Sequence, residues 1–94
     1  MSNHFSDNSA SRRFELDVGG QIAFANYERR GRELVISHVE APIPLRGKGA
    51  ASELMTRVAE LARAEQRTIL PYCGYARAWM RRHPEYRDLA ARAE

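Results

Sequence analysis

The stretch Leu45-Arg46-Gly47-Lys48-Gly49-Ala50-Ala51 has the composition of a phosphate-binding turn that leads into a helix. Two glycines two positions apart let the backbone turn tightly, and they leave bare N–H groups for a bulky anion. Residues 50–66 then have the pattern of a helix, whose first turn presents free N–H groups and the positive end of its dipole. Because Arg46 and Lys48 add two cations, we predict a site for an anion of pyrophosphate size.

Three half-buried strands are expected before this turn. In the first of them apolar residues alternate with polar ones, which is the period of a strand with one buried face, and the third is centred on Leu34-Val35-Ile36. Short turns at Gly19-Gly20 and at residues 29–32 favour an antiparallel meander. Pro42 and Pro44 end its last strand, because neither can donate to a sheet ladder. The predicted strands are residues 13–18, 21–28 and 33–40.

The chain after the turn predicts a strand–helix–strand unit. Apolar residues recur about every 3.6 positions along residues 50–66, as in a helix that packs against a sheet. Residues 68–72 form a short strand, which such a crossover places parallel to the third strand of the meander. A second helix over residues 74–82 and a last helical turn from Pro84 follow. The predicted fold class is therefore α+β.

The whole chain has the size and composition of one domain. Its 94 residues are 44% apolar and 29% charged, which is an ordinary globular balance. The net charge of +3 suits an anionic ligand or nucleic acid, although a solvated helix surface is the better explanation of it. We expect residues 1–11 to be a flexible tail and residues 12–94 to be the domain.

Cysteine content and hydropathy indicate the compartment. The single cysteine, Cys73, excludes an internal disulfide framework and points to a reducing environment. No apolar run is long enough to cross a membrane, and the polar residues 1–11 lack the centre of a secretion signal. We therefore expect a soluble cytoplasmic protein.

Four blocks of the sequence resemble the GNAT superfamily of acetyl-CoA-dependent N-acetyltransferases. Residues 46–51, Arg-Gly-Lys-Gly-Ala-Ala, match the superfamily signature Gln/Arg-x-x-Gly-x-Gly/Ala. With residues 38–40 (His-Val-Glu), 71–73 (Pro-Tyr-Cys) and 81–86 (Arg-Arg-His-Pro-Glu-Tyr), they look like its minimal single-domain branch, called YjdJ-type. The likeness covers residues 14–89. Since a short glycine pattern matches many phosphate sites by chance, the order and spacing of the four blocks carry the resemblance.

The resemblance implies that the strand over residues 68–72 splays away from the strand over residues 33–40, and that coenzyme A lies in the wedge between them. The backbone of residues 39–41 would pair with the pantetheine arm, and residues 46–51 would hold the pyrophosphate. The helices that wall off the acceptor in larger relatives are missing, as are their final strands, so we expect an open acceptor side. The implied cofactor-binding residues are Val39, Ala41, Arg46, Gly47, Lys48, Gly49, Ala50, Ala51, Tyr75 and Arg81.

His38 and Glu40 are candidates for the base that accepts a proton from the acceptor amine. They are two positions apart on a predicted strand, so both side chains point to one face, which by the same alternation carries Leu34 and Ile36. A histidine is the better tuned of the two near neutral pH. The alternatives are a hydrogen-bonded structural histidine at the sheet end and a solvated carboxylate.

Cys73 is the third catalytic candidate. It directly precedes a predicted helix, whose dipole and free N–H groups acidify a thiol. In the branch that the chain resembles, a cysteine at the matching place is the favoured catalytic residue, and it either takes the acetyl group covalently or positions or protonates the leaving sulfur. A small buried apolar residue is the alternative. Tyr75 is a candidate proton donor to the departing thiolate, and Arg81 and Arg82 are candidates for the adenosine phosphate.

These residues predict an N-acetyltransferase that takes acetyl-CoA as co-substrate and acetylates an amine on a small molecule or a protein. An acyl-CoA-binding regulatory or interaction module with little turnover is the alternative. A nucleic-acid binder ranks last, since the chain lacks the aromatic and basic strand motif of common RNA-binding sheets. No metal-ligand spacing occurs, so we expect no metal. We expect a monomer or weak homodimer with no membrane partner.

Overall fold

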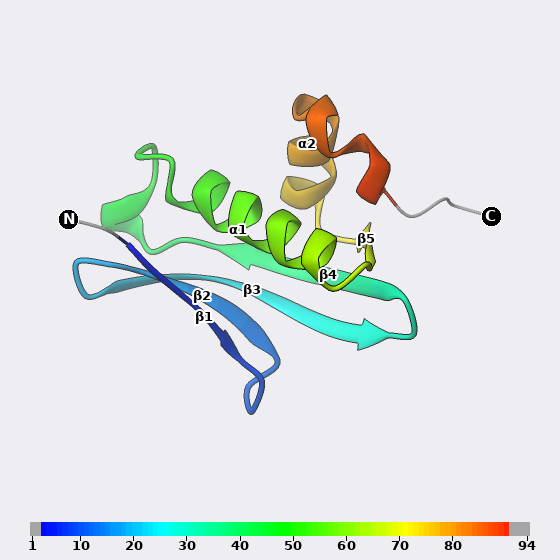
Figure 1. Ribbon diagram of the computed structural model, residues 1–94. Coiled ribbons are helices and arrows are strands. Elements are labelled where there is room, and N and C mark those ends of the chain that lie inside the picture. The colour runs from blue at the N-terminus through cyan, green and yellow to red at the C-terminus, as the bar shows by residue number, and fades with distance from the viewer. Residues whose placement is uncertain (1–2, 91–94) are drawn as a thin grey trace.

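Within residues 3–90, which the computed structural model describes, five strands form one sheet and the helices lie together on one of its faces (Figure 1). None of the described helices is long and apolar enough to span a membrane. The elements are β1 (His4–Asn8), β2 (Arg13–Val18), β3 (Gln21–Arg30), β4 (Glu33–Glu40), η1 (Ile43–Leu45), α1 (Ala50–Ala64), β5 (Thr68–Pro71), α2 (Gly74–Arg82) and η2 (Pro84–Leu89), where η denotes a 3-10 turn.

The sheet has the strand order β1-β2-β3-β4-β5. Neighbours from β1 to β4 are antiparallel, whereas β5 lies parallel to β4 after the crossover through α1. This arrangement confirms the predicted α+β class, the antiparallel meander and the parallel strand–helix–strand unit. α1 is two residues shorter than the predicted helix over residues 50–66, because the chain leaves the helix at Gln66, whose φ is +57°.

β1 extends the predicted meander from three strands to four. The sequence predicts a flexible tail over residues 1–11, and this is wrong for the part that the structure describes, since every residue of β1 pairs with a residue of β2. Phe5 supplies the physical reason, because its ring stacks on Phe14 with centroids 5.8 Å apart. Burying an aromatic ring offsets the cost of ordering a short polar strand. Residues 1–2 of the predicted tail and 91–94 of the predicted domain lie outside the described residues.

A β-bulge interrupts the pairing of β3 with β4. Ile36 pairs with Tyr27, yet the next pair along the strands is His38 with Asn26, so Ser37 is an extra residue in β4. Its hydroxyl donates to the Asn26 carbonyl at 3.4 Å. Because side chains alternate along a strand, one extra residue exchanges the two faces for everything that follows it.

The bulge overturns one prediction about the candidate base. The sequence predicts that His38 and Glu40 share the sheet face of Leu34 and Ile36. Instead, Val39 packs against the core after the bulge, and His38 and Glu40 point to the other side. The two residues still share a face with each other. That face, which none of the described helices covers, is called the open face below.

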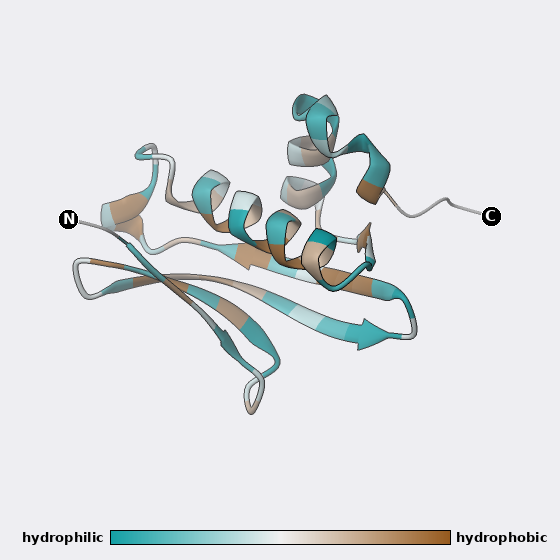
Figure 2. Cartoon of the chain, viewed as in Figure 1, coloured by the Kyte–Doolittle hydropathy of each residue, from teal (hydrophilic) through white to brown (hydrophobic). Residues whose placement is uncertain are grey.

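One layer of apolar side chains fills the space between the sheet and the helices. α1 buries Leu54, Val58 and Ala62 completely, as its 3.6-residue period predicts. Phe14 and Ile36 belong to the same cluster from the sheet side. In Figure 2 the hydrophobic stretches of β4 lie directly under α1, whereas the outer side of that helix is hydrophilic. The core therefore holds α1, and with it the turn that precedes α1, at a fixed place over the sheet.

β4 and β5 part where their parallel ladder ends. Ile36 and Pro71 are the last paired residues. The N–H groups of Tyr72 and Cys73 both donate to the Ile36 carbonyl, at 2.9 and 3.2 Å, and the chain then turns into α2. β4 continues to Glu40 with no strand on that edge among residues 3–90. This divergence confirms the predicted splay of the two strands and leaves a wedge between β4 and the start of α2.

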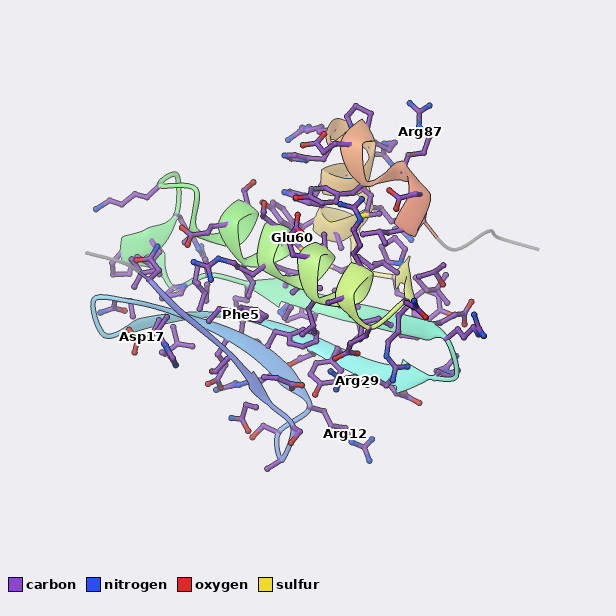
Figure 3. All side chains as sticks on the ribbon, in the orientation of Figure 1. Phe5, Arg12, Asp17, Arg29, Glu60 and Arg87 are labelled. Carbon is purple, nitrogen blue, oxygen red and sulfur yellow. The ribbon has the colours of Figure 1, made fainter. Side chains whose placement is uncertain are left out.

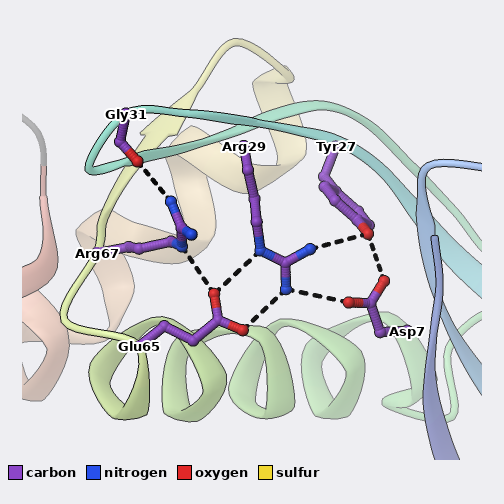
Figure 4. Close-up of polar contacts among 6 residues, drawn as sticks. All are labelled: Asp7, Tyr27, Arg29, Gly31, Glu65 and Arg67. Atoms are coloured by element: carbon purple, nitrogen blue, oxygen red, sulfur yellow. Dashed lines mark hydrogen bonds and ion pairs between the residues drawn. The ribbon is translucent and has the colours of Figure 1, made fainter.

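A polar network fastens β1 and β3 to the C-terminal end of α1 (Figure 4). The Arg29 guanidinium donates to both carboxylate oxygens of Glu65, at 3.0 and 2.8 Å, and to Asp7 at 3.0 Å. The Tyr27 hydroxyl accepts from Arg29 at 3.1 Å and donates to Asp7. Arg67 donates to Glu65 at 2.7 Å. The hydrogen bonds from Arg29, with a smaller contribution from Arg67, lower the pKa of Glu65.

Candidate functional site

A pocket of about 610 Å³ opens between the end of β4, the loop over residues 46–49, the first turn of α1 and Tyr75 of α2. It gathers all the predicted cofactor-binding residues except Lys48 and Arg81. Its walls consist of Val39, Glu40, Ala41, Leu45, Arg46, Gly47, Gly49, Ala50, Ala51, Ser52 and Tyr75.

Backbone conformation explains both glycines of the loop. Gly47 and Gly49 have φ angles of +79° and +82°. These lie in the left-handed region, where a residue with a side chain is strained. A Cβ added at either position would meet no atom within 4 Å, so the angle and not crowding requires glycine. Gly49 is also the N-cap of α1, which receives no side-chain capping bond. The first turn of α1 is therefore open toward the pocket.

Together, the loop and the first turn of α1 leave most of their amides without an acceptor among residues 3–90. The N–H groups of Arg46 and Lys48 close the turn by donating to backbone carbonyls at 3.1 and 3.2 Å. Other N–H groups of the loop and first helical turn have no acceptor within residues 3–90, and an anion in the pocket would satisfy them together with the helix dipole. These free donors belong to Gly47, Gly49, Ala50, Ala51 and Ser52. The residues present thus fit the diphosphate of coenzyme A.

The two cations of the loop have different roles. Arg46 donates from Nε to the carbonyl of Ala41 at 3.1 Å, which ties the loop to the chain leaving β4. Lys48 is exposed and does not line the pocket. Arg46 therefore braces the wall of the pocket, while Lys48 contributes a long-range positive charge near its rim.

His38 and Glu40 form a hydrogen-bonded pair on the open face. His38 Nε2 lies 3.0 Å from Glu40 Oε1, and the two side chains are 51% and 50% exposed. The His38 ring stands beside Phe24 of β3, with centroids 6.1 Å apart. Glu40 also lines the pocket. The two candidate bases therefore contact each other, and Glu40 belongs both to the pocket lining and to the open face.

Cys73 lies where β4 and β5 part. It is the N-cap of α2, is half-buried and packs against the core. It does not line the pocket, whereas Tyr75, two residues further on, does. Burial raises the pKa of Tyr75, and the nearby Arg82 charge and Ser52 hydroxyl act in the opposite direction. The structure thus places a thiol at the apex of the wedge and a protonated phenol on the pocket wall.

Arg81 is not brought into the pocket. It lines a separate hollow of about 420 Å³ on α2 and η2, together with Met80, Pro84, Arg87 and Ala90. Among the residues that the structure describes, no three His, Cys, Asp or Glu side chains gather as a metal site would require. The pocket also contains Leu45 and Ser52, which sequence reasoning missed. Only the position of Ser52 in the first helical turn hinted at its place, because that turn faces the predicted anion.

Comparisons with known proteins agree with this geometry. The sequence matches the profile of a family described as GCN5-related N-acetyl-transferase over residues 13–89. The chain is also similar to the solution NMR structure of a GCN5-like protein from Staphylococcus aureus, named there as a proposed N-acetyltransferase, with a TM-score of 0.70. The two chains are 23% identical, and the match covers 100% of this chain and 94% of the other, which supports the fold. No curated protein is significantly similar in sequence.

Proposed function

Because the chain belongs to the GCN5-related N-acetyl-transferase family, we propose that it moves an acetyl group from acetyl-CoA to an amine. One observation carries the proposal. The pocket beside the diverging end of β4 is lined by a turn and a first helical turn in which the amides of Gly47, Gly49, Ala50, Ala51 and Ser52 have no partner among residues 3–90. We further assign the chain to the minimal single-domain YjdJ-type branch, since β2 is joined to β3 by a tight turn with no intervening helices.

The residues of the pocket have separate tasks in donor binding. The free amides of residues 47–52 hold the diphosphate, and the dipole of α1 favours its negative charge. The unpaired edge of β4 at Val39 and Ala41 offers backbone groups to the pantetheine arm. Bound acetyl-CoA supplies a thioester whose C–S bond breaks as the new C–N bond forms.

The proton of the acceptor amine goes to the His38–Glu40 pair. Glu40 lines the pocket and His38 lies 3.0 Å from it, so the pair takes the proton either at Glu40 directly or at His38. The exposure of both side chains keeps them in reach of an acceptor that approaches over the open face. We therefore place donor and acceptor on different sides of the end of β4.

Cys73 acts on the sulfur side of the reaction. Its place at the apex of the wedge suits two chemistries, namely transient acetylation of its own sulfur or positioning and protonation of the leaving thiolate. Tyr75, whose raised pKa keeps its hydroxyl protonated, is a second proton donor on the pocket wall. The acceptor is an amine of a small molecule or protein in the cytoplasm, where a free thiol stays reduced.

A thermal-shift titration tests donor binding. At 100-fold excess over its Kd, a ligand stabilises the native state by about 2.7 kcal/mol. For a domain of this size such an increment raises Tm by roughly 10 °C or more. We expect acetyl-CoA and coenzyme A to produce this shift and inorganic phosphate to produce none. Stabilisation without acetylated product over a panel of amines would instead indicate an acyl-CoA-binding module, and binding of nucleic acid alone would overturn the proposal.

The variant Gly49→Glu tests whether acetyl-CoA binds at the loop over residues 46–49. It puts a side chain and a negative charge where the diphosphate is expected, at a φ of +82°. Gly31→Glu is the matched control, because Gly31 also has a positive φ, of +60°, and open space around an added Cβ, but lies in the β3–β4 turn. We expect both variants to lose similar stability and only Gly49→Glu to lose the acetyl-CoA shift. An equal loss of that shift in both would remove the loop from donor binding.

A further inference from the structure

Trp79 of α2 is buried, and its indole N–H needs a hydrogen-bond acceptor. Its side chain is 3% exposed, and its indole N–H donates to Ser52 Oγ at 2.9 Å. A buried indole N–H without an acceptor is costly, so this bond fixes where α2 lies relative to α1. Ser52 is the third residue of α1 and directly follows the amides that line the pocket.

Ser52 contacts Trp79 and also lines the pocket. It shares the pocket wall with Tyr75, which lies one helical turn before Trp79 and on the same side of α2. A serine hydroxyl that accepts from an indole still carries a hydrogen to donate. The nearby Ser52 hydroxyl is one of the influences that lower the pKa of Tyr75 against the effect of burial. The hydroxyl of Ser52 in α1 thus bonds α2, and the same residue lines the pocket.

A second bond joins the same parts of the chain but lies away from the pocket. The Tyr86 hydroxyl donates to Glu60 Oε2 at 2.7 Å, two helical turns along α1 from Ser52. Figure 3 shows Glu60 on the side of α1 that is turned toward α2. Neither Tyr86 nor Glu60 lines the pocket. Arg63 of α1 also donates to the Glu85 carbonyl and to Asp88, at 3.2 and 2.8 Å. The segment from α2 to η2 is therefore fastened to α1 at several points, of which only Ser52 lines the pocket.

We propose that Ser52 is a positioning residue, which sets Tyr75 and the start of α2 relative to the phosphate loop and so couples occupancy of the pocket to α2. Cys73, as the N-cap of α2, is positioned through the same contact. The coupling to ligand rests on the proposed function of the pocket. The positioning itself does not, because it is a property of the free protein.

Titration of the tyrosines tests the positioning without any ligand. Protein labelled with 13C at the tyrosine ζ carbon gives one signal for each of its four tyrosines, and Tyr75→Phe identifies one of them. We expect Ser52→Ala to raise the pKa of Tyr75, Ser52→Thr to restore it, and Tyr86→Phe to leave it unchanged. We also expect a raised Tyr75 pKa in Trp79→Phe, which keeps an aromatic ring and removes the indole N–H donor. An unchanged Tyr75 pKa in both Ser52→Ala and Trp79→Phe overturns the proposal.

Tryptophan fluorescence tests the coupling. Trp79 is the single tryptophan of the chain, so its emission reports on this contact alone. We expect coenzyme A to change the emission of the wild-type protein and of Tyr86→Phe. In Ser52→Ala the change is lost while calorimetry still detects binding, and for acetyl-CoA turnover kcat falls with KM nearly constant. The same emission change in Ser52→Ala contradicts the coupling, whereas no binding of coenzyme A to the wild type contradicts the proposed function and leaves the tyrosine titration to decide on Ser52.

Discussion

Glu40 belongs to two surfaces at once, and this makes it the central residue of the candidate site. It lines the pocket for the donor, and it pairs with His38 at 3.0 Å on the open face. Glu40 is the last residue of β4, at the end that has no strand on its β5 side among residues 3–90. A group in that place can take a proton from an amine that comes from one side while the thioester lies on the other.

Replacement of Glu40 by glutamine keeps the shape of the side chain and removes its basicity. General-base catalysis contributes about 10²- to 10⁴-fold, so we expect kcat to fall by at least about 100-fold while the acetyl-CoA thermal shift persists. Steady-state kinetics with any amine that the wild type acetylates provides the measurement. Glu28→Gln is the control, because Glu28 lies on the open face but pairs only with Arg30. Equal activity of both variants would leave Glu40 without a part in the chemistry.

Removal of the Cys73 thiol separates binding from turnover. We expect Cys73→Ala to bind coenzyme A as the wild type does, since Cys73 does not line the pocket, and to lose most of its acetylation rate. Mass spectrometry of the wild type after a short reaction with acetyl-CoA distinguishes the two chemistries, because a covalent route adds one acetyl group at Cys73. A fully active Cys73→Ala would show that the thiol is a packing residue at the N-cap of α2.

At the scale of elements, the fold depends on how the edge strand and the end of α1 are fastened. β1 is short and polar, yet it is held by Phe5 on Phe14 and by Asp7 in the network around Arg29. The same guanidinium bonds Glu65, which immediately follows α1. The network thus fixes the C-terminal end of the helix whose N-terminal end forms the pocket (Figure 4).

Acid should weaken this network. The pKa of Glu65 is lowered from 4.5 mainly by Arg29, so its contribution to stability is complete above about pH 4.5 and is lost as pH falls through the lower native value. We expect Glu65→Gln to lower the free energy of unfolding by about 1 kcal/mol at pH 7, and the difference from the wild type to shrink below pH 4.5. Urea unfolding at several pH values measures it. Glu28→Gln, at an exposed ion pair, is expected to change stability by a few tenths of a kcal/mol, and an equal effect would argue against the network.

Elements with a strong period were predictable, and irregular features were not. β4 and α2 have the predicted bounds, and α1 begins at the predicted residue, because their apolar residues repeat at strand or helix spacing. The bulge at Ser37 escaped prediction, since residues 33–40, centred on Leu34-Val35-Ile36, are equally consistent with a regular strand. β1 was not predicted, because Phe5 is its one large apolar residue among five and gives no recognisable strand pattern.

The candidate site was predictable where it is made of backbone. The free amides of Gly47, Gly49 and the first turn of α1 follow from local sequence, and the pocket forms around them. The orientation of His38 and Glu40 depended on the bulge and was predicted wrongly. The contact of Ser52 with Trp79 spans 27 positions, and no local pattern encodes a bond between two residues so far apart.

At the scale of the whole molecule, the described helices lie on one face of the sheet and leave the other face without helical cover (Figure 1), which is where we propose that the acceptor binds. Donor and acceptor sites are then separate surfaces that a substitution can affect one at a time. Asn26 pairs with His38 across the strands and lies on the open face. Arg57 projects from the outer side of α1, where it pairs with Glu53 at 3.5 Å.

A bulky residue on the open face should obstruct the acceptor alone. We expect Asn26→Trp to raise KM for the acceptor by about tenfold and to leave the acetyl-CoA thermal shift unchanged. Arg57→Trp adds the same bulk on the helical side and should change neither quantity. If Asn26→Trp left KM for every amine as it was, the acceptor would have to approach from another direction.

The extra residue in β4 has a consequence for how such a protein changes over generations. Loss of the single codon for Ser37 would restore a regular strand, turn Val39 outward and bury His38 and Glu40, with the rest of the strand unaltered. An insertion or deletion of one residue at this place therefore decides whether His38 and Glu40 lie on the open face. Point substitutions would need several coordinated steps to do the same.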